Sequence, residues 1–311
     1  KYSEQLERRT DMDTNILLEN GTNELEVLEF TLGKNHYGIN VAKIREILSY
    51  QPVTPIPNAN PSVEGIFMPR DVMITVINLK HCLGLSDSTV TDEGLLIITN
   101  FNKLNIAFHV DEVIGIHRVS WADIITPDST VSSQDSGIAT GVVKIDNQLI
   151  IILDFEKIVS DISPETGLKV SDIEEYEGRE RSQAHVISVE DSPLLGAMIG
   201  NSLKKSGYVN LTRFANGQEA WDYLQEVKSG AVPNDIACII TDIEMPQMDG
   251  HRLTKLVKEN GDMNHIPVVI FSSLVNQEMK IKGEQLGADA QLSKPEIGQL
   301  VAAIDKLVGN E

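Results

Sequence analysis

In the C-terminal half of the chain, short apolar runs are followed directly by polar residues that could take part in chemistry. These residues are Glu190, Asp191, Asp242, Ser272 and Lys294. Carboxylates close together repel one another unless a cation is present, and Mg²⁺ favours one or two carboxylates, water and phosphoryl oxygens as ligands. A carboxylate such as Asp242 can attack phosphorus, while a lysine and a hydroxyl neutralise and orient the phosphoryl oxygens. The set would suit phosphoryl transfer to Asp242.

The residue pattern around this set predicts a parallel α/β sheet. Apolar runs lie at 184–189, 238–241, 267–271 and 290–292, and helical stretches at 193–205, 217–228, 250–259, 277–286 and 296–308. Strands that alternate with helices of this length are typical of βαβ units. Sites in doubly wound sheets form outside the carboxyl ends of the strands. We therefore expect the polar residues to converge at one edge of the sheet.

The order of these motifs resembles the response-regulator receiver family. The matching segments are 189–192, 241–250, 272–273, 286–289 and 294–295. The run Asp-x-x-Met-Pro-x-Met-Asp-Gly that begins at Asp242 is highly specific for that family. The resemblance implies a flavodoxin-like fold with a doubly wound, five-stranded parallel sheet.

The resemblance also implies a role for each acidic residue. Asp242 would accept a phosphoryl group from a histidine kinase. Mg²⁺ would be bound by Asp191, Asp242 and the backbone carbonyl of Glu244, and Glu190 would hold a metal-bound water. Beyond the phosphorylation and dephosphorylation of its own receiver, we expect no enzymatic activity.

Two further residues would contact the phosphoryl group, and two positions depart from the family pattern. Ser272 would donate a hydrogen bond to one phosphoryl oxygen, and Lys294 would pair with another. Gln291 stands where the family usually carries an aromatic residue that changes rotamer on switching. Leu274, like Glu244, would border the attacking water, and we expect it to limit water access and lengthen the lifetime of the acyl phosphate.

The N-terminal half has a different pattern, which favours small β-barrels. Short apolar runs bounded by turn residues lie at 26–32, 36–40, 72–78, 95–99, 105–110, 141–145 and 148–153. Repeated short strands with turn residues between them are typical of barrels and sandwiches. Short helices are expected at 41–48 and 79–83. No metal spacing, nucleophile elbow, phosphate-binding loop or dinucleotide motif occurs in this half.

Its motifs resemble the CheW-like coupling family. The matching segments are 30–33, 37–48, 55–65, 77–85, 110–113 and 140–154. The resemblance implies two small five-stranded β-barrels that bind methyl-accepting chemoreceptors and the CheA-type histidine kinase. Arg70 keeps the spacing from Gly65 at which the family carries an important arginine, although Met-Pro precedes it here. Partner contacts are expected at Arg70, Ile39, Val41 and Ile44; alternatively, the apolar residues fill a barrel core and Arg70 braces a loop.

Composition excludes several other classes of protein. The formal net charge is −20, whereas binding to nucleic acid needs clustered lysine and arginine. A transcription factor is therefore disfavoured. No run of 18 apolar residues is present, so direct insertion into a membrane is not expected. The first residues, Lys1 to Asp13, are charged and polar, so we expect no signal peptide there.

Together these patterns predict a cytoplasmic signalling adaptor associated with membrane chemoreceptor arrays. We expect a CheW-like domain at 16–160, a linker at 161–183 and a receiver domain at 184–309. Phosphorylation at Asp242 would change the coupling of receptors to the kinase. The alternative is a phosphate sink, in which the coupling domain only localises the receiver; whether phosphorylation changes receptor–kinase binding separates the two.

Overall fold

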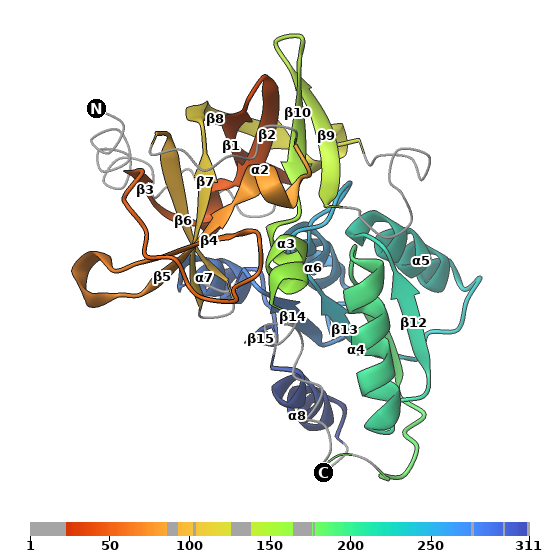
Figure 1. Ribbon diagram of the computed structural model, residues 1–311. Coiled ribbons are helices and arrows are strands. Elements are labelled where there is room, and N and C mark those ends of the chain that lie inside the picture. The colour runs from red at the N-terminus through yellow and green to blue at the C-terminus, as the bar shows by residue number, and fades with distance from the viewer. Residues whose placement is uncertain are drawn as a thin grey trace. The chain divides into compact units, whose positions relative to one another are not determined.

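The computed structural model describes residues 23–85, 93–101, 104–125, 138–163, 176, 178–274, 277–294 and 296–309. These residues fall into two compact units, one of Glu24–Pro164 and one that contains Glu165–Glu311 (Figure 1). Much of the linker expected at 161–183 lies outside the described residues, as do the first residues of the expected coupling domain.

The first unit contains two five-stranded sheets, the number of strands that its motifs imply. The first sheet has the order β8 (Glu112–Ser120), β1 (Glu24–Leu32), β2 (Asn35–Asn40), β10 (Gln148–Leu153), β9 (Ala139–Ile145). The second has the order β3 (Ile44–Ser49), β6 (Leu95–Phe101), β7 (Leu104–Val110), β5 (Ile74–Asn78), β4 (Val63–Phe67). Short helical segments connect or flank the strands: η1 (Val41–Lys43), η2 (Pro69–Asp71), α2 (Leu79–Cys82), η3 (Trp121–Asp123) and α3 (Phe155–Ile162).

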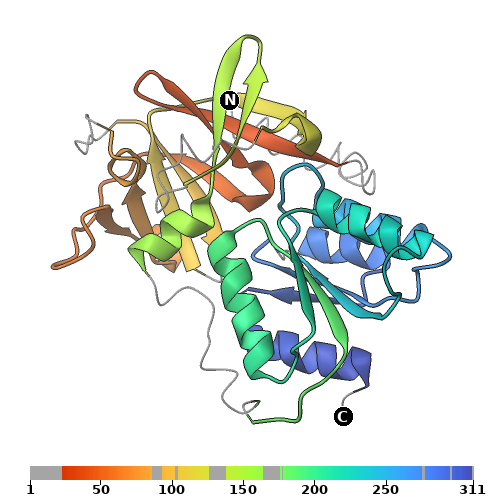
Figure 2. The same cartoon turned by 90° about the vertical axis from the view of Figure 1, so that its right-hand side faces the viewer.

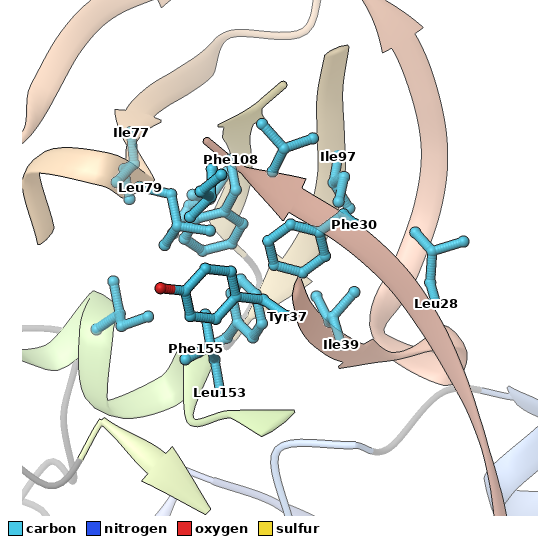
Figure 3. Close-up of a cluster of buried hydrophobic side chains, with 14 of the residues drawn as sticks. Leu28, Phe30, Tyr37, Ile39, Ile77, Leu79, Ile97, Phe108, Leu153 and Phe155 are labelled. Atoms are coloured by element: carbon cyan, nitrogen blue, oxygen red, sulfur yellow. The ribbon is translucent and has the colours of Figure 1, made fainter. Parts of the chain in front are cut away.

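A shared apolar core joins the two sheets of this unit. Phe30 of β1, Phe108 of β7 and Phe155 of α3 are fully buried in it (Figure 3). The ring centroids of Phe108 and Phe155 are 4.7 Å apart, and those of Phe30 and Phe155 are 6.3 Å apart. Helix α3 thus supplies an aromatic side chain that contacts both sheets, and burial of three such rings makes this core a main source of stability.

The helix expected at 41–48 is wrong, because most of that segment is a strand. Only Val41–Lys43 forms a helical turn, capped by Asn40 Oδ1, which accepts a hydrogen bond of 3.0 Å from Ala42 N. From Ile44 the chain pairs with β6, so that Ile47 lies opposite Ile97. Apolar residues at every third position suggest a helix, but β-branched residues also suit a strand when a partner strand is present.

His109 is buried between hydrogen-bond acceptors in the second sheet. Its Nδ1 lies 2.9 Å from Glu64 Oε1, and its Nε2 lies 2.7 Å from the backbone oxygen of Glu93. The Tyr50 ring lies against it, with centroids 4.5 Å apart. The backbone oxygen of Glu93 can only accept, so Nε2 carries a proton, and an ionised Glu64 carboxylate favours a second proton on Nδ1 and so a charged imidazole. Burial opposes the charge, but the hydrogen bonds to Glu64 and Glu93 and the nearby Asp111 prevail and raise the pKa of His109.

This arrangement predicts that the first unit is more stable in mild acid than in mild base. A pKa raised by folding contributes stability that is complete below the unfolded value of about 6.5 and lost as pH rises through the folded value. We expect a loss on the order of 1 kcal/mol in the free energy of unfolding between pH 6 and pH 9. Urea unfolding at both pH values tests this. His109→Gln should remove the dependence and the exposed His81→Gln should keep it; equal slopes in the two variants would contradict the assignment.

The second unit is a five-stranded parallel sheet with helices on both faces, as the receiver resemblance implies. The strand order is β12 (Leu211–Phe214), β11 (His185–Val189), β13 (Ile236–Thr241), β14 (Val268–Ser272), β15 (Ala290–Ser293). The helices are α4 (Pro193–Lys205), α5 (Gly217–Ser229), α6 (Gly250–Glu259), α7 (Gln277–Gln285) and α8 (Ile297–Val308). Helices α4 and α8 pack on one face of the sheet, and α5 and α6 pack on the other (Figure 2).

The buried strands of this sheet are apolar on both faces, which explains their continuous apolar runs in the sequence. In β13, Cys238 and Ile240 face α4 and α8, whereas Ile239 faces α5 and α6. None of the helices in the described part of the chain combines the length and the hydropathy that a bilayer crossing requires.

Candidate functional site

The carboxyl ends of the parallel strands bring the polar set together. Glu190 and Asp191 follow β11, and Asp242 follows β13. The N–H of Asp242 donates to Val189 O at 3.0 Å, so the two strands remain paired up to the acidic residues. Glu190, Asp191 and Asp242 each offer an oxygen, and these oxygens lie within 4.8 Å of one another. The convergence expected from the strand ends is thus present.

Lys294 is a buried cation between two of these carboxylates. Its Nζ donates to Glu190 Oε2 at 2.7 Å and to Asp242 Oδ2 at 2.9 Å. The three side chains are only 3–6% exposed. Burial of charges is tolerated when they are paired, so this triad is a preorganised site that holds Asp242 in place.

The acidic cluster suits a divalent cation. Three carboxylates meet one lysine ammonium, which leaves the group with an excess of negative charge. Hard cations such as Mg²⁺ prefer oxygen ligands and bind to one or two carboxylates together with phosphate oxygens. Asp191 is half-buried, so one side of the cluster remains open to solvent. The donor set therefore fits a cation such as Mg²⁺.

Ser272 lies at the end of β14, next to the lysine. The register places Ser272 opposite Ser293, and Lys294 N donates to Ser272 O at 3.1 Å. The Ser272 side chain is buried, and its Oγ accepts a hydrogen bond from Leu274 N at 3.2 Å. A serine hydroxyl that accepts one hydrogen bond can still donate another. Leu274 itself is 6% exposed and packs as an apolar residue two positions after the serine.

The loop after Asp242 requires a glycine at position 250. A Cβ there would overlap Asp242 O and would lie 2.8 Å from its carbonyl carbon and 2.9 Å from Thr241 Oγ1. The Thr241 hydroxyl also donates to Asp242 O at 2.8 Å. Asp249 begins α6 by accepting from Arg252 N at 2.6 Å, and burial raises the pKa of its carboxyl. Gly250 and Asp249 shape the loop, and neither needs to take part in the chemistry.

The structure adds Arg213, which sequence reasoning did not single out. This exposed side chain of β12 lies along α4, where a Cβ at Gly196 would be 2.9 Å from its Nη2 and 3.4 Å from Glu190 Cγ. A Cβ at Gly200 would lie 3.4 Å from Arg213 Cδ. The sequence does contain a signal for this contact: Gly196 and Gly200 lie four residues apart, on the same face of α4, where a long side chain can pack against the helix. Arg213 brings a second positive charge near the acidic cluster.

The expected partner-binding residues of the first unit lie in different environments. Arg70 is exposed on η2 and has a left-handed backbone with φ 53°, and Asp71 follows with φ 64°. Met68 and Met73 flank this loop and are 66% and 63% exposed. Methionine and arginine are both enriched at protein interfaces. Arg70 thus lies where a partner can reach it.

Ile39 does not lie on an accessible surface. Its side chain is fully buried in the shared core of the first unit, so we correct its expected partner contact to a packing role. Val41 and Ile44 are half-buried at the margin of the same core. The burial has a simple cause: residues of β2 alternate between the two faces of the sheet, and Ile39 falls on the core side.

Comparison with known proteins gives the class to which each unit belongs. Residues 26–163 match the CheW-like domain family, and residues 186–305 match the response regulator receiver domain family. Chemotaxis protein CheV3 of Helicobacter pylori is 28% identical, and the match covers 88% of this chain and 88% of CheV3. CheV2 of the same organism is 27% identical over 96% of this chain and 98% of its own. Chemotaxis protein CheW of Thermotoga maritima is 30% identical over 47% of this chain and 94% of its own.

A CheW-like domain followed by a receiver domain defines a regulatory signalling protein of the two-component class. Residues 26–163 belong to the CheW-like domain family and residues 186–305 to the response regulator receiver domain family. As a whole, the chain is similar to the CheV chemotaxis proteins, which match it over most of its length. The acidic cluster described above lies in the unit that matches the receiver family.

Proposed function

We propose that this protein is an adaptor that couples chemoreceptors to a CheA-type histidine kinase, and that Mg²⁺-dependent phosphorylation of Asp242 regulates the coupling. The observation that carries the proposal is the buried contact of Lys294 with Asp242 and Glu190. The same chain supplies a CheW-like domain. The proposal divides the chain into a coupling domain at 16–160, a linker at 161–183 and a receiver at 184–309, acting in the cytoplasm beside the receptor arrays.

The chemistry we propose is transfer of a phosphoryl group from a kinase histidine to Asp242. A carboxylate oxygen of Asp242 forms a bond to phosphorus while the bond from phosphorus to the imidazole nitrogen breaks. Lys294 pairs with one phosphoryl oxygen and the Ser272 hydroxyl donates to another. Bound Mg²⁺ would neutralise charge on the acidic cluster and the phosphoryl oxygens, held by Asp191, Asp242 and the backbone carbonyl of Glu244.

Phosphorylation must then favour one of two states of the protein, since a modification shifts an equilibrium only through differential stabilisation. Ser272 and Lys294 are the groups that would exchange their present partners for phosphoryl oxygens. Lys294 would leave Glu190, and the Ser272 hydroxyl would acquire an acceptor. Both residues lie at the end of the β14–β15 pair, so the change begins at that edge of the sheet.

Reconstitution tests the adaptor function directly. Receptor-containing membranes, CheA-type kinase and this protein are mixed, and the kinase that sediments with the membranes is measured with and without phosphorylation of the adaptor. We expect this protein to increase sedimented kinase and phosphorylation to change the amount. If the protein retains kinase but phosphorylation changes nothing, the phosphate-sink alternative replaces the regulated adaptor. If no kinase is retained, the coupling function is wrong.

Arg70→Ala is expected to weaken the association of the protein with receptor and kinase about tenfold. The side chain is exposed between Met68 and Met73, and arginine beside apolar groups is enriched among residues that dominate interfaces. Arg118→Ala, on β8 of the other sheet of the same unit, is the matched control, since its guanidinium is also partly exposed and pairs with Glu24. Equal affinity of the two variants in the sedimentation assay would show that Arg70 only supports its loop.

Leu274→Asn is expected to shorten the lifetime of the acyl phosphate about tenfold, equivalent to ~1.4 kcal/mol of barrier. The buried leucine follows Ser272 closely and would exclude water from phosphorus, whereas an asparagine amide could hold a water there. Loss of label from phosphorylated wild type and variant is followed after removal of the kinase. Leu274→Met is the control, because it keeps an apolar side chain of similar volume. Equal decay in all three proteins would exclude this role.

A further inference from the structure

Gln291 connects β15 to α7 through its side-chain amide. Its Nε2 donates a hydrogen bond of 2.7 Å to the backbone oxygen of Lys280, within α7. Because Lys280 O can only accept, it fixes which side of the amide faces the helix. The strand and the helix are therefore joined by a polar contact at a position where the sequence pattern of related domains would place an aromatic ring.

Gly283 of α7 provides the space for this amide. A Cβ at position 283 would lie 2.5 Å from Gln291 Cδ and 2.8 Å from Gln291 Nε2, distances that real Cβ atoms do not show. Gly283 is buried and lies inside the helix. Glycine inside a helix lowers helix stability compared with alanine. Gly283 therefore makes α7 less stable, but it leaves room for the Gln291 amide.

The contact gives the amide nitrogen of Gln291 a hydrogen-bond partner but leaves its oxygen without one in the part of the chain that the structure describes. Gln291 Oε1 is buried and has no hydrogen-bond partner among the described residues of the chain. A buried acceptor without a donor destabilises the arrangement that contains it. The joined state is therefore held by one hydrogen bond and opposed by one unsatisfied oxygen, so a small change of environment can open it. Elements balanced in this way suit two-state switches.

The position of Gln291 links it to the phospho-acceptor site. Gln291 pairs with Ile270, and two residues further along both strands Ser272 pairs with Ser293. Lys294 follows directly and contacts Asp242. A shift of Lys294 and Ser272 toward a phosphoryl group would move the strand that carries Gln291, and the hydrogen bond to Lys280 is the contact that this movement would strain.

We propose that Gln291 and Gly283 form a clasp that positions α7 in the unphosphorylated protein, and that phosphorylation of Asp242 opens it. The clasp connects the strand that leads to Lys294 with helix α7. Opening frees α7 and gives Gln291 Oε1 access to a donor. This inference rests on the proposed role of Asp242 as phospho-acceptor.

Hydrogen–deuterium exchange of the full-length protein tests the clasp. Backbone exchange across 280–286 is measured with Mg²⁺ alone and with Mg²⁺ plus beryllofluoride, a stable analogue of the phosphoryl group. We expect beryllofluoride to accelerate exchange in wild-type α7 about tenfold, the effect of removing one hydrogen bond of ordinary strength. In Gln291→Ala, exchange should already be fast and should not respond further.

A double-mutant cycle provides the matched control. Gly283→Ala should open the clasp by overlap with the Gln291 amide and so accelerate exchange of α7. In the Gln291→Ala background there is no amide for the added methyl group at position 283 to overlap. Alanine should then slow exchange, because it favours the helix more than glycine does. The opposite sign in the two backgrounds distinguishes the clasp from a general effect of position 283. Unchanged exchange in β13 reports that each variant is folded.

Fluorine NMR of the same samples reports whether beryllofluoride is bound. Bound beryllofluoride with unchanged exchange in wild-type α7 would overturn the clasp and leave the phospho-acceptor site intact. Wild-type exchange in Gln291→Ala would also overturn it. Absence of bound beryllofluoride in the wild type, with Mg²⁺ present, would overturn both the clasp as a switch and the proposed role of Asp242.

Discussion

Replacement of Asp242 by asparagine is expected to abolish transfer of labelled phosphate from a CheA-type kinase, by at least roughly a thousandfold. The amide keeps the shape of the side chain but lacks the nucleophilic oxygen. In the wild type, Lys294 Nζ donates to Asp242 Oδ2 at 2.9 Å. The asparagine side chain keeps one oxygen that can accept this hydrogen bond, so the loop should remain folded. Transfer is measured with Mg²⁺ as label that stays with this protein after separation from the kinase.

Asp262→Asn is the matched control for this experiment. Asp262 also belongs to the second unit, but its side chain is 70% exposed and pairs with Lys228. It should accept label at the wild-type rate. Label that persists on the Asp242 variant would mean that another carboxylate of the cluster, such as Asp191, accepts the phosphoryl group. No label on the wild type, with active kinase, would mean that the second unit serves only for docking.

Phe155→Ala is expected to destabilise the first unit by about 3–5 kcal/mol, the usual cost of removing a buried aromatic side chain. The ring is fully buried and contacts both Phe30 and Phe108, so its loss opens a cavity between the two sheets. A loss of this size is a large fraction of the stability of an ordinary domain. Coupling of receptors to kinase should fail at temperatures where the wild type still functions.

The chain offers a clean readout of this loss. It contains two tryptophans, Trp121 in the core of the first unit and Trp221 in the second. In a Trp221→Phe background, fluorescence during urea unfolding reports the first unit. Leu149→Ala, at a side chain that is 57% exposed, should change the free energy of unfolding by less than about 0.5 kcal/mol. A similar small change for Phe155→Ala would show that the shared core relaxes to fill the cavity.

Much of the second unit could be predicted from the sequence because its signals are local. Helix α4 begins at Pro193 and α6 at Gly250, as expected, since Ser192 and Asp249 cap the first turns with side chains adjacent in sequence. The buried strands are apolar on both faces and therefore stand out as continuous runs. Strand β12 is short and half-exposed, and for that reason it was missing from the apolar runs that we identified.

The first unit was harder to predict, because its strands depend on partners distant in the sequence. Strands β4 and β8 are mixtures of apolar and polar residues, including Glu64, Gly65 and Arg118, and neither was expected. The residues of β3 alone suggest a helix, because its strand conformation depends on pairing with β6, which is distant in the sequence. Helix α3 was also missed; its main support is Phe155, which packs into a core built by both sheets.

Local sequence motifs were enough to identify the two domain families and the set of carboxylates, serine and lysine at the strand ends. This was possible because these residues occupy fixed places beside short motifs. The three-dimensional packing was needed to find that Ile39 is buried, that Arg213 lies against Gly196, and that the Gln291 amide lies against Gly283. Each of these facts is a contact between residues far apart along the chain or on different elements, and such contacts are selected by packing of the whole unit, not by local preference.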